Sequence, residues 1–222
     1  MSHTPSEVVF ASLLTPERKV SLRHMLDTQL QDKPLSAAAL QSWQTQWQTL
    51  TVSPDSDDRE AAHVDWLIAV FNATFCMHDT ILVRGTAEPE YFPATSDAPA
   101  RIEFAHGFFA SALHEISHWC LAGTHRRTQP DFGYWYAPDG RSQAEQAAFE
   151  RVEIKPQAIE CLLTLACGRT FRVSQDNLFA DFDTSGSTFT HDVYEQALNY
   201  LEYPARLPKD AKRLLWVLLS CC

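Results

Sequence analysis

The sequence FFASALHEISHWCL, residues 108–121, decides how the chain around it is organised. Its apolar residues recur at helical spacing, and Gly123 follows as a residue type that commonly ends a helix. Within this predicted helix, His114-Glu115-Ile116-Ser117-His118 matches the H-E-x-x-H motif. Residues four apart in a helix lie on one face, so both imidazoles can bind a single metal ion. The alternative is a helix that carries two unrelated, partly buried histidines.

Two histidines do not make a tight metal site, so a third ligand is expected on the helix that follows. A capping box at Ser142-Gln143-Ala144-Glu145 predicts that this helix covers residues 142–167. Glu150 and Glu153 lie on one of its faces. Pro156 is expected to kink the helix beside Glu153, where side-chain direction is most specifically set. We therefore predict Glu153 as the third ligand and keep Glu150 as the alternative.

Two more residues are candidates for the surroundings of the ligands. Gln157 lies on the same helical face as Glu150 and Glu153, and is expected to contact a ligand from outside the metal site. His106, at the end of a predicted strand, is a candidate ligand or hydrogen-bond donor to a ligand. For His106 we favour the alternative that it is a hydrogen-bonded histidine of the core.

The proposed ligand set limits the chemistry without choosing the metal. Two imidazoles and one carboxylate leave coordination positions open, which suits Fe(II) oxygen chemistry and catalytic zinc alike. With zinc, Glu115 would be the base that deprotonates the attacking water. With iron, Glu115 would orient a ligand or relay a proton. In both cases Glu115 is the predicted catalytic residue.

Outside this centre, helical patterns alternate with a few short strands, which predicts an α+β (mixed α/β) fold. We expect a compact single domain with a small sheet, the H-E-x-x-H helix and an N-terminal helical extension. Residues 1–60 form the extension, a brace in preference to an interaction arm, with a linker at 53–58, and residues 61–222 form the catalytic domain. Further helices are expected at 17–31, after Ser36, at 64–75, at 190–200 and at the apolar 214–219, and strands at 81–85, 101–105 and 134–136.

Composition narrows the classes of partner. The net charge of −10 disfavours nucleic-acid binding, which needs a basic face. No apolar run approaches the roughly 20 residues that span a bilayer. Six cysteines without a C-x-x-C pair, scattered through apolar stretches, predict buried thiols in a reducing compartment. We expect a cytoplasmic protein without direct contact to nucleic acid or membrane.

From Val64 onward the chain resembles the elongation factor P hydroxylase family, bacterial enzymes that hydroxylate the lysyl-modified lysine of elongation factor P. The central blocks of the resemblance are distinctive and occur in order along the chain. They are Ala87–Ala94, Phe104–Cys120, Ala122-Gly123, Arg126-Arg127, Asp131–Tyr136, Pro138–Arg141, Phe149-Glu150, Val152-Glu153, Lys155–Ala158, Val173-Ser174 and Asp176–Leu178.

The resemblance implies a metal-dependent hydroxylase with a two-histidine, one-carboxylate site and a protein substrate, modified elongation factor P. The family's metal motif falls here on His114, His118 and Glu153. For such an enzyme we expect Fe(II) as the divalent metal and dioxygen as co-substrate. Two departures stand out: the first 60 or so residues look like an extension beyond the family core, and the tail after Pro204 diverges.

A lysyl-modified lysine carries more than one ammonium, so its site should offer carboxylates that do not bind the metal. Glu115, Asp131, Asp139 and Glu150 are near the motif in sequence, and we predict that one or more of them holds the substrate amines. Tyr134 belongs to an aromatic run that would stack on the alkylammonium chain. The alternative is that these aromatics fill the core.

Three other functions are compatible with the motif. A zinc metallopeptidase also uses H-E-x-x-H and would cleave proteins without oxygen, but the blocks outside the motif oppose it. A metal-dependent nuclease is disfavoured by the acidic charge balance. A non-catalytic module with a structural metal is disfavoured by the open coordination of the ligand set.

Overall fold

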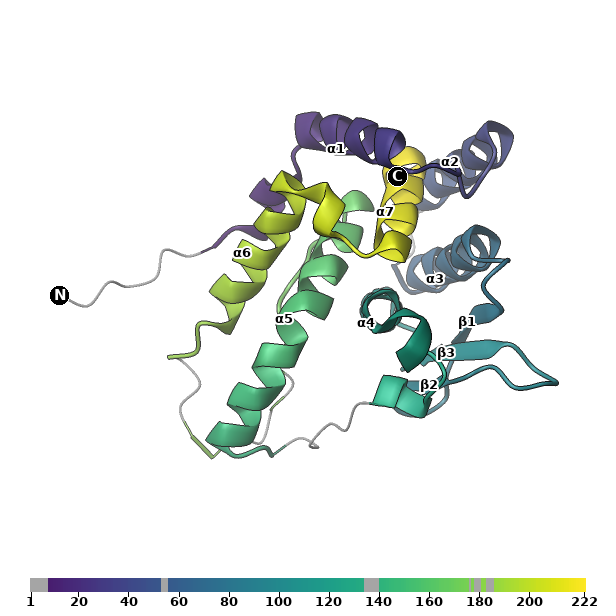
Figure 1. The fold of residues 1–222 in the computed structure, drawn as a ribbon. Coiled ribbons are helices and arrows are strands. Elements are labelled where there is room, and N and C mark those ends of the chain that lie inside the picture. Colours follow the sequence, from purple (N-terminus) through teal and green to yellow (C-terminus); the bar gives the residue numbers. More distant parts are fainter. Residues whose placement is uncertain (1–7, 53–55, 134–139, 176, 178–180, 183–185) are drawn as a thin grey trace.

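The structure, a computed structural model, describes residues 8–222 except 53–55, 134–139, 176, 178–180 and 183–185 (Figure 1). Over these residues the chain forms seven α-helices, three short 3-10 helices and one three-stranded sheet, an α+β fold as the sequence predicts. The α-helices are α1 Pro16–Gln29, α2 Ala37–Val52, α3 Ser56–Thr74, α4 Phe109–Arg126, α5 Gln143–Ala166, α6 Phe189–Glu202 and α7 Lys209–Cys221. The strands are β1 Thr80–Arg84, β2 Glu90–Phe92 and β3 Ala100–Phe104, and the 3-10 helices are η1 Phe10–Leu14, η2 Pro130–Gly133 and η3 Pro204–Arg206.

The small sheet leads the chain into α4. Its order is β1-β3-β2, with β3 parallel to β1 and antiparallel to β2. Leu82, Tyr91 and Ile102 are opposite one another in the three strands, and all three are buried. Because side chains alternate between the two faces of a strand, this register turns one face toward the core. Strand β2, with only three residues, has no predicted counterpart in the sequence analysis.

The first turn of α4 is fixed by side chains from other elements. The Glu60 carboxylate, on α3, accepts a hydrogen bond from the Phe109 backbone N–H at 2.9 Å. A negative charge at a helix N-terminus is favourable, because the first N–H groups have no partner within the helix. Glu60 also forms an ion pair with Arg169, which follows α5. One carboxylate therefore ties together α3, α4 and the end of α5.

The C-terminal end of α4 is held by a partly buried arginine, Arg127. The Arg127 guanidinium lies over the Trp119 ring, 3.5 Å from its centroid, and donates two hydrogen bonds to the Trp119 carbonyl at 3.0 and 2.8 Å. It also pairs with Asp210 of α7 at 2.6 Å, and the Arg127 carbonyl accepts from the Tyr91 hydroxyl at 2.8 Å. Arg127 thus joins α4 to α7 and to β2.

The N-terminal helices pack into the same core as the rest of the chain. Leu22 and Leu26 of α1 and Trp47 of α2 are buried together with Leu214 and Leu218 of α7. Figure 1 shows α1 and α2 lying beside α7. Such packing is expected if residues 1–60 act as a helical brace.

Replacing Leu26 with alanine is expected to lower the free energy of unfolding by about 2–5 kcal/mol, the cost of a cavity in a packed core. Leu26 is fully buried, whereas Val20 on the same helix is 67% exposed. Val20→Ala is therefore the control and should change stability by less than about 0.5 kcal/mol. Urea denaturation of both variants makes the comparison. Equal stability of the two would mean that α1 does not brace the core.

Most predicted elements are confirmed, and several boundaries differ. The predicted 53–58 linker is wrong for Ser56 onward, because α3 begins there. Helix α4 leaves the helical backbone at Gly123, with φ 66° and ψ 176°, where the sequence predicts its end, and one further helical turn then continues to Arg126. Helix α5 runs without interruption through Pro156, and its Ser142 capping box is present. The predicted strand at 134–136 lies outside the described residues.

The predictions about the cysteines and about membrane-spanning segments can also be compared with the structure. All six cysteines are free; Cys120, Cys161, Cys167 and Cys221 are buried as predicted, whereas Cys76 and Cys222 are exposed. Among the described helices, none combines the length and apolar character needed to cross a bilayer.

Candidate metal centre

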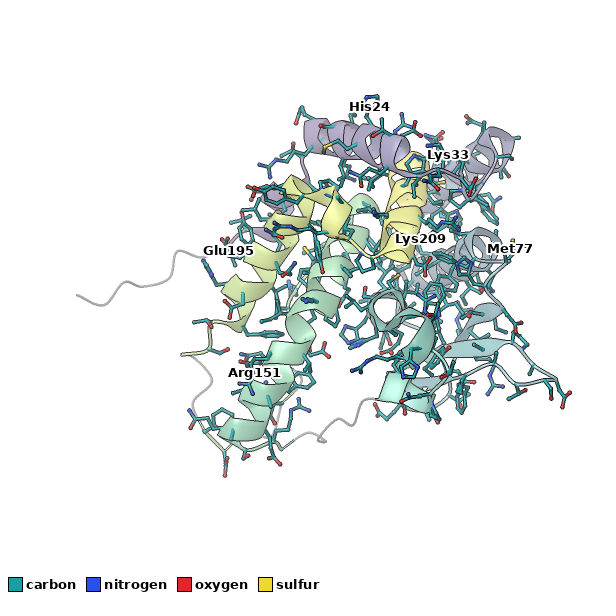
Figure 2. All side chains as sticks on the ribbon, in the orientation of Figure 1. His24, Lys33, Met77, Arg151, Glu195 and Lys209 are labelled. Atoms are coloured by element: carbon teal, nitrogen blue, oxygen red, sulfur yellow. The ribbon has the colours of Figure 1, made fainter. Side chains whose placement is uncertain are left out.

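Helices α4 and α5 face each other, and side chains from both fill the space between them (Figure 2). His114 and His118, one turn apart on α4, direct their Nε2 atoms at each other at 3.1 Å. From α5, the Glu153 carboxylate approaches His118 Nε2 at 3.3 Å and His114 Nε2 at 3.6 Å. Three ligand atoms thus converge on one point from two helices.

These three groups fit a divalent metal. Ligand atoms bound about 2.1 Å from one ion at tetrahedral or octahedral angles lie roughly 3.0–3.4 Å apart, close to the separations found here. Glu153 is 1% exposed, and its Oε2 has no hydrogen-bond partner among the described residues. A buried carboxylate oxygen without a donor is costly unless a cation satisfies it. The ligand set therefore has the spacing, the charge and the unsatisfied atom that a metal site requires.

The charges around His114, His118 and Glu153 also favour the binding of a cation. Burial by itself would raise the pKa of Glu153, but the His118 and His114 imidazoles outweigh it and hold this pKa below its usual value. Burial by itself would lower the pKa of His114, but the carboxylates of Glu160, Glu153 and Glu115 raise it to about 10. The carboxylates thus create a strongly cation-attracting site, which a proton fills when no metal is bound.

Glu115 lies beside the ligand set, next to His114 on α4, and is partly buried. Burial raises the pKa of Glu115, and the nearby Glu153 and Glu160 carboxylates add to the effect, while the two histidines oppose it. A carboxyl group with a raised pKa keeps its proton more readily than an ordinary one, which favours a role in proton transfer. This environment is compatible with the predicted catalytic role of Glu115.

Glu150, the alternative third ligand, is engaged elsewhere. Its Oε1 accepts from the side-chain amides of Gln146 at 3.2 Å and Gln175 at 3.3 Å, and its Oε2 accepts from the Ser187 hydroxyl at 2.9 Å. These donors are all neutral. The structure therefore brings Glu153, and not Glu150, to the histidines, and leaves Glu150 as a carboxylate whose hydrogen-bond donors here are uncharged.

Gln157 and His106, the two candidates for the surroundings of the ligands, lie in different environments. Gln157 is 2% exposed and holds the backbone of Ser174, donating to its carbonyl at 2.7 Å and accepting from its N–H at 3.1 Å. It also helps to lower the pKa of Glu153. His106 is exposed, with its ring near Phe108, and lies outside the group of three ligand residues. The interpretation of His106 as a core histidine is therefore wrong.

The remaining candidates for substrate binding lie in the sequence between α4 and α5. Asp131, in η2, adopts a left-handed backbone conformation at φ 47°, and its Oδ1 accepts from the Tyr91 N–H at 3.0 Å. This contact fixes η2 against β2 and accounts for one of its two carboxylate oxygens. Tyr134 and Asp139 lie outside the described residues, and their substrate-binding roles stay predictions.

Glu160 is a site residue that was not predicted from the sequence. Its Oε2 lies 2.9 Å from His114 Nδ1, the ring nitrogen opposite the ligand atom, and the residue is 9% exposed. Glu153 and Glu160 are seven residues apart, two helical turns, so both face α4. The same periodicity that selected Glu150, Glu153 and Gln157 contained the signal, had it been followed one turn further.

Comparison with known proteins places this chain in a family. The model of the family described as elongation factor P hydroxylase matches residues 70–221. A relative from Haemophilus influenzae, named elongation factor P lysine hydroxylase, is 48% identical over 158 residues, covering 69% of this chain and 86% of that protein. Because the family match continues to residue 221, the expectation that the tail after Pro204 diverges from the family is wrong. The match begins within α3, so α1 and α2 lie before it. By both the family model and the identity to this relative, the chain belongs to the elongation factor P hydroxylase family.

Proposed function

We propose that this protein is a metal-dependent hydroxylase of the lysyl-modified lysine of elongation factor P. His114, His118 and Glu153 would hold the divalent metal, Fe(II), and dioxygen would be the co-substrate. The observation that carries the proposal is the convergence of three ligand atoms from His114, His118 and Glu153, together with a buried Glu153 Oε2 that has no hydrogen-bond donor among the described residues. Membership of the family, and the name of the relative from Haemophilus influenzae, support the substrate.

When bound, the metal supplies the redox chemistry that lets dioxygen insert one oxygen atom into a C–H bond. The second oxygen atom leaves as water, so the reaction needs two electrons and two protons from a reductant. His114 and His118 would direct their Nε2 lone pairs at the metal, and Glu153 would supply one negative charge. Three ligands leave positions open, and the near-complete burial of Glu153 and His118 keeps bulk water away from this side of the site.

Two other acidic residues would have separate roles, one in proton transfer and one in substrate binding. Glu115, with its raised pKa, would take up or release the proton. Glu150 lies on α5 one turn before Glu153, and its three neutral donors leave its negative charge available to an ammonium group. The arrangement would place the cationic side chain of the substrate alongside α5, with its reacting carbon toward the metal ligands.

The test is an intact-mass measurement on lysyl-modified elongation factor P. The enzyme is loaded with Fe(II) without oxygen and then exposed to air, with ascorbate as the reductant and with or without a 2-oxo acid. A gain of one oxygen atom is expected in air and not under argon. The His118→Ala variant should give no mass gain and should retain no iron on desalting, with an unchanged far-ultraviolet circular dichroism spectrum.

A different result would identify a different enzyme. If the protein purified from its cells holds zinc and no condition changes the substrate mass, the hydroxylase proposal fails. Peptide cleavage by that zinc form, independent of oxygen, would establish the metallopeptidase alternative.

Glu150→Gln is expected to raise KM for the modified substrate by about 10- to 100-fold, with kcat nearly unchanged, because a charge-assisted hydrogen bond contributes about 1.5–3 kcal/mol. Glutamine keeps the shape of the side chain, removes its charge and replaces one acceptor oxygen with an NH2 group, from which the Ser187 hydroxyl can accept. The same substitution at the exposed Glu195 of α6, labelled in Figure 2, is the control and should leave KM unchanged. Steady-state kinetics that give equal KM values for both variants would remove Glu150 from the substrate site.

A further inference from the structure

The Glu160 carboxylate contacts a proposed metal ligand without belonging to the ligand group itself. We propose that Glu160 is a positioning residue: it accepts the Nδ1 proton of His114 and thereby fixes the ring so that Nε2 presents its lone pair to the metal. The proposal deepens the proposed function and rests on a metal being bound at this centre. It assigns a role to a residue that is not itself a ligand.

The hydrogen bonds of His114 define its tautomer. A neutral imidazole has one N–H and one nitrogen with a free lone pair. Glu160 Oε2 lies 2.9 Å from Nδ1, and a carboxylate can only accept, so Nδ1 carries the hydrogen. In the neutral form of the ring that binds a metal, the lone pair is then on Nε2, which lies 3.1 Å from His118 Nε2 and 3.6 Å from Glu153 Oε2. The contact with Glu160 thus selects the tautomer that can bind a metal at the site.

The geometry also explains why Glu160 is not a fourth ligand. Its oxygen lies on the Nδ1 side of the His114 ring, while the ligand atoms meet on the Nε2 side. The imidazole ring therefore separates Glu160 from the point where the three ligand atoms converge. A carboxylate behind a metal-bound histidine is a common arrangement, because it orients the ring and strengthens the ligand.

The burial of Glu160 indicates that its contact with His114 fixes the conformation of the Glu160 side chain. Glu160 is 9% exposed, and its neighbours Ile159 and Cys161 are buried. A carboxylate at such a position is costly without a partner, and His114 is the partner the structure provides. Helix α5 thus contributes two carboxylates to His114, with Glu153 on one ring nitrogen and Glu160 on the other.

The first readout is metal affinity, measured with Co(II) or Zn(II) against a chromophoric chelator. Glu160→Gln keeps the size of the side chain and an oxygen that can accept from Nδ1, so we expect about a 10-fold loss. Glu160→Ala removes the acceptor, so we expect about a 100-fold loss. Glu150→Gln is the matched control on the same helix and should bind metal like the unmodified protein. Far-ultraviolet circular dichroism of the metal-free variants checks that they fold.

The second readout is the tautomer itself, which a merely structural role would not change. In the Zn(II)-loaded protein labelled with ¹⁵N, long-range ¹H–¹⁵N spectra should show His114 protonated at Nδ1. In Glu160→Ala this signal should exchange rapidly with water or be lost, with partial recovery in Glu160→Gln. Unchanged affinity together with an unchanged His114 spectrum in Glu160→Ala would overturn the proposal.

The two proposals fail separately. Binding of Co(II) and Zn(II) does not require any hydroxylation to occur. If unmodified enzyme adds no oxygen to its substrate, yet the Glu160 variants lose metal affinity as expected, the positioning role stands and the hydroxylase proposal falls. If hydroxylation occurs and the Glu160 variants bind metal normally, the reverse holds.

Discussion

Glu153→Gln is expected to abolish oxygen incorporation and to weaken metal binding by at least about 100-fold, while the protein stays folded. The substitution keeps the shape of a side chain that is 1% exposed and replaces a charged oxygen with an amide group. An amide is a poorer ligand than a carboxylate for a divalent cation, and it does not neutralise the ion's charge. The loss should therefore appear in metal affinity and in turnover, and not in the helical content of the protein.

Three measurements separate this outcome from simple unfolding. Metal content after desalting reports affinity, intact mass of the substrate reports turnover, and circular dichroism reports the fold. Glu150→Gln is the control that distinguishes the two glutamates first considered for the third ligand: it should keep its metal and lose only substrate affinity. Full hydroxylation by Glu153→Gln, or loss of metal from Glu150→Gln alone, would show that the third ligand had been assigned to the wrong residue.

Arg127→Met is expected to lower the free energy of unfolding by about 3–5 kcal/mol, because it removes the arginine partner of the buried Asp210 carboxylate and leaves it only the His78 imidazole, 3.4 Å away. Asp210 is 8% exposed and pairs with the Arg127 guanidinium at 2.6 Å. The variant also loses two hydrogen bonds to the Trp119 carbonyl and the contact of the guanidinium with the Trp119 ring. Methionine fills most of the vacated space, so the loss reports mainly the charge and the hydrogen bonds.

Urea denaturation of Arg127→Met, Asp210→Asn and the double variant gives the coupling between the two residues. The double variant should be less destabilised than the sum of the single variants, because each single change removes the oppositely charged partner from a charged group that is largely shielded from water. The control is Arg151→Met on the exposed side of α5, labelled in Figure 2, which should change stability by less than about 1 kcal/mol. If Arg127→Met proves as stable as Arg151→Met, the pair contributes nothing measurable.

Local sequence was sufficient wherever the determining contacts lie within a few residues. His114 and His118 meet because residues four apart share one face of a helix, which needs no knowledge of the fold. The Ser142 capping box and the alternating burial of Ile102 and its neighbours in β3 follow from equally local rules. The exposed His106 shows where local sequence is insufficient. A single histidine at the end of a strand does not indicate whether other segments of the chain will pack over it.

Burial, charge pairing and the direction of the long side chains required the tertiary structure. Periodicity put Glu150, Glu153 and Glu160 on one stripe of α5, but only the packing of α5 against α4 decided which of them meets which histidine nitrogen. Arg127 and Asp210 are 83 positions apart, and Glu60 reaches the start of α4 over 49 positions. The sequence by itself thus determined the helices, the histidine pair and the family resemblance, because those depend on near neighbours and local spacing. Tertiary packing decided that Glu153 meets the histidines at Nε2, that Glu160 meets His114 at Nδ1, and that Arg127 pairs with Asp210, because these contacts join residues that only the folded chain brings together.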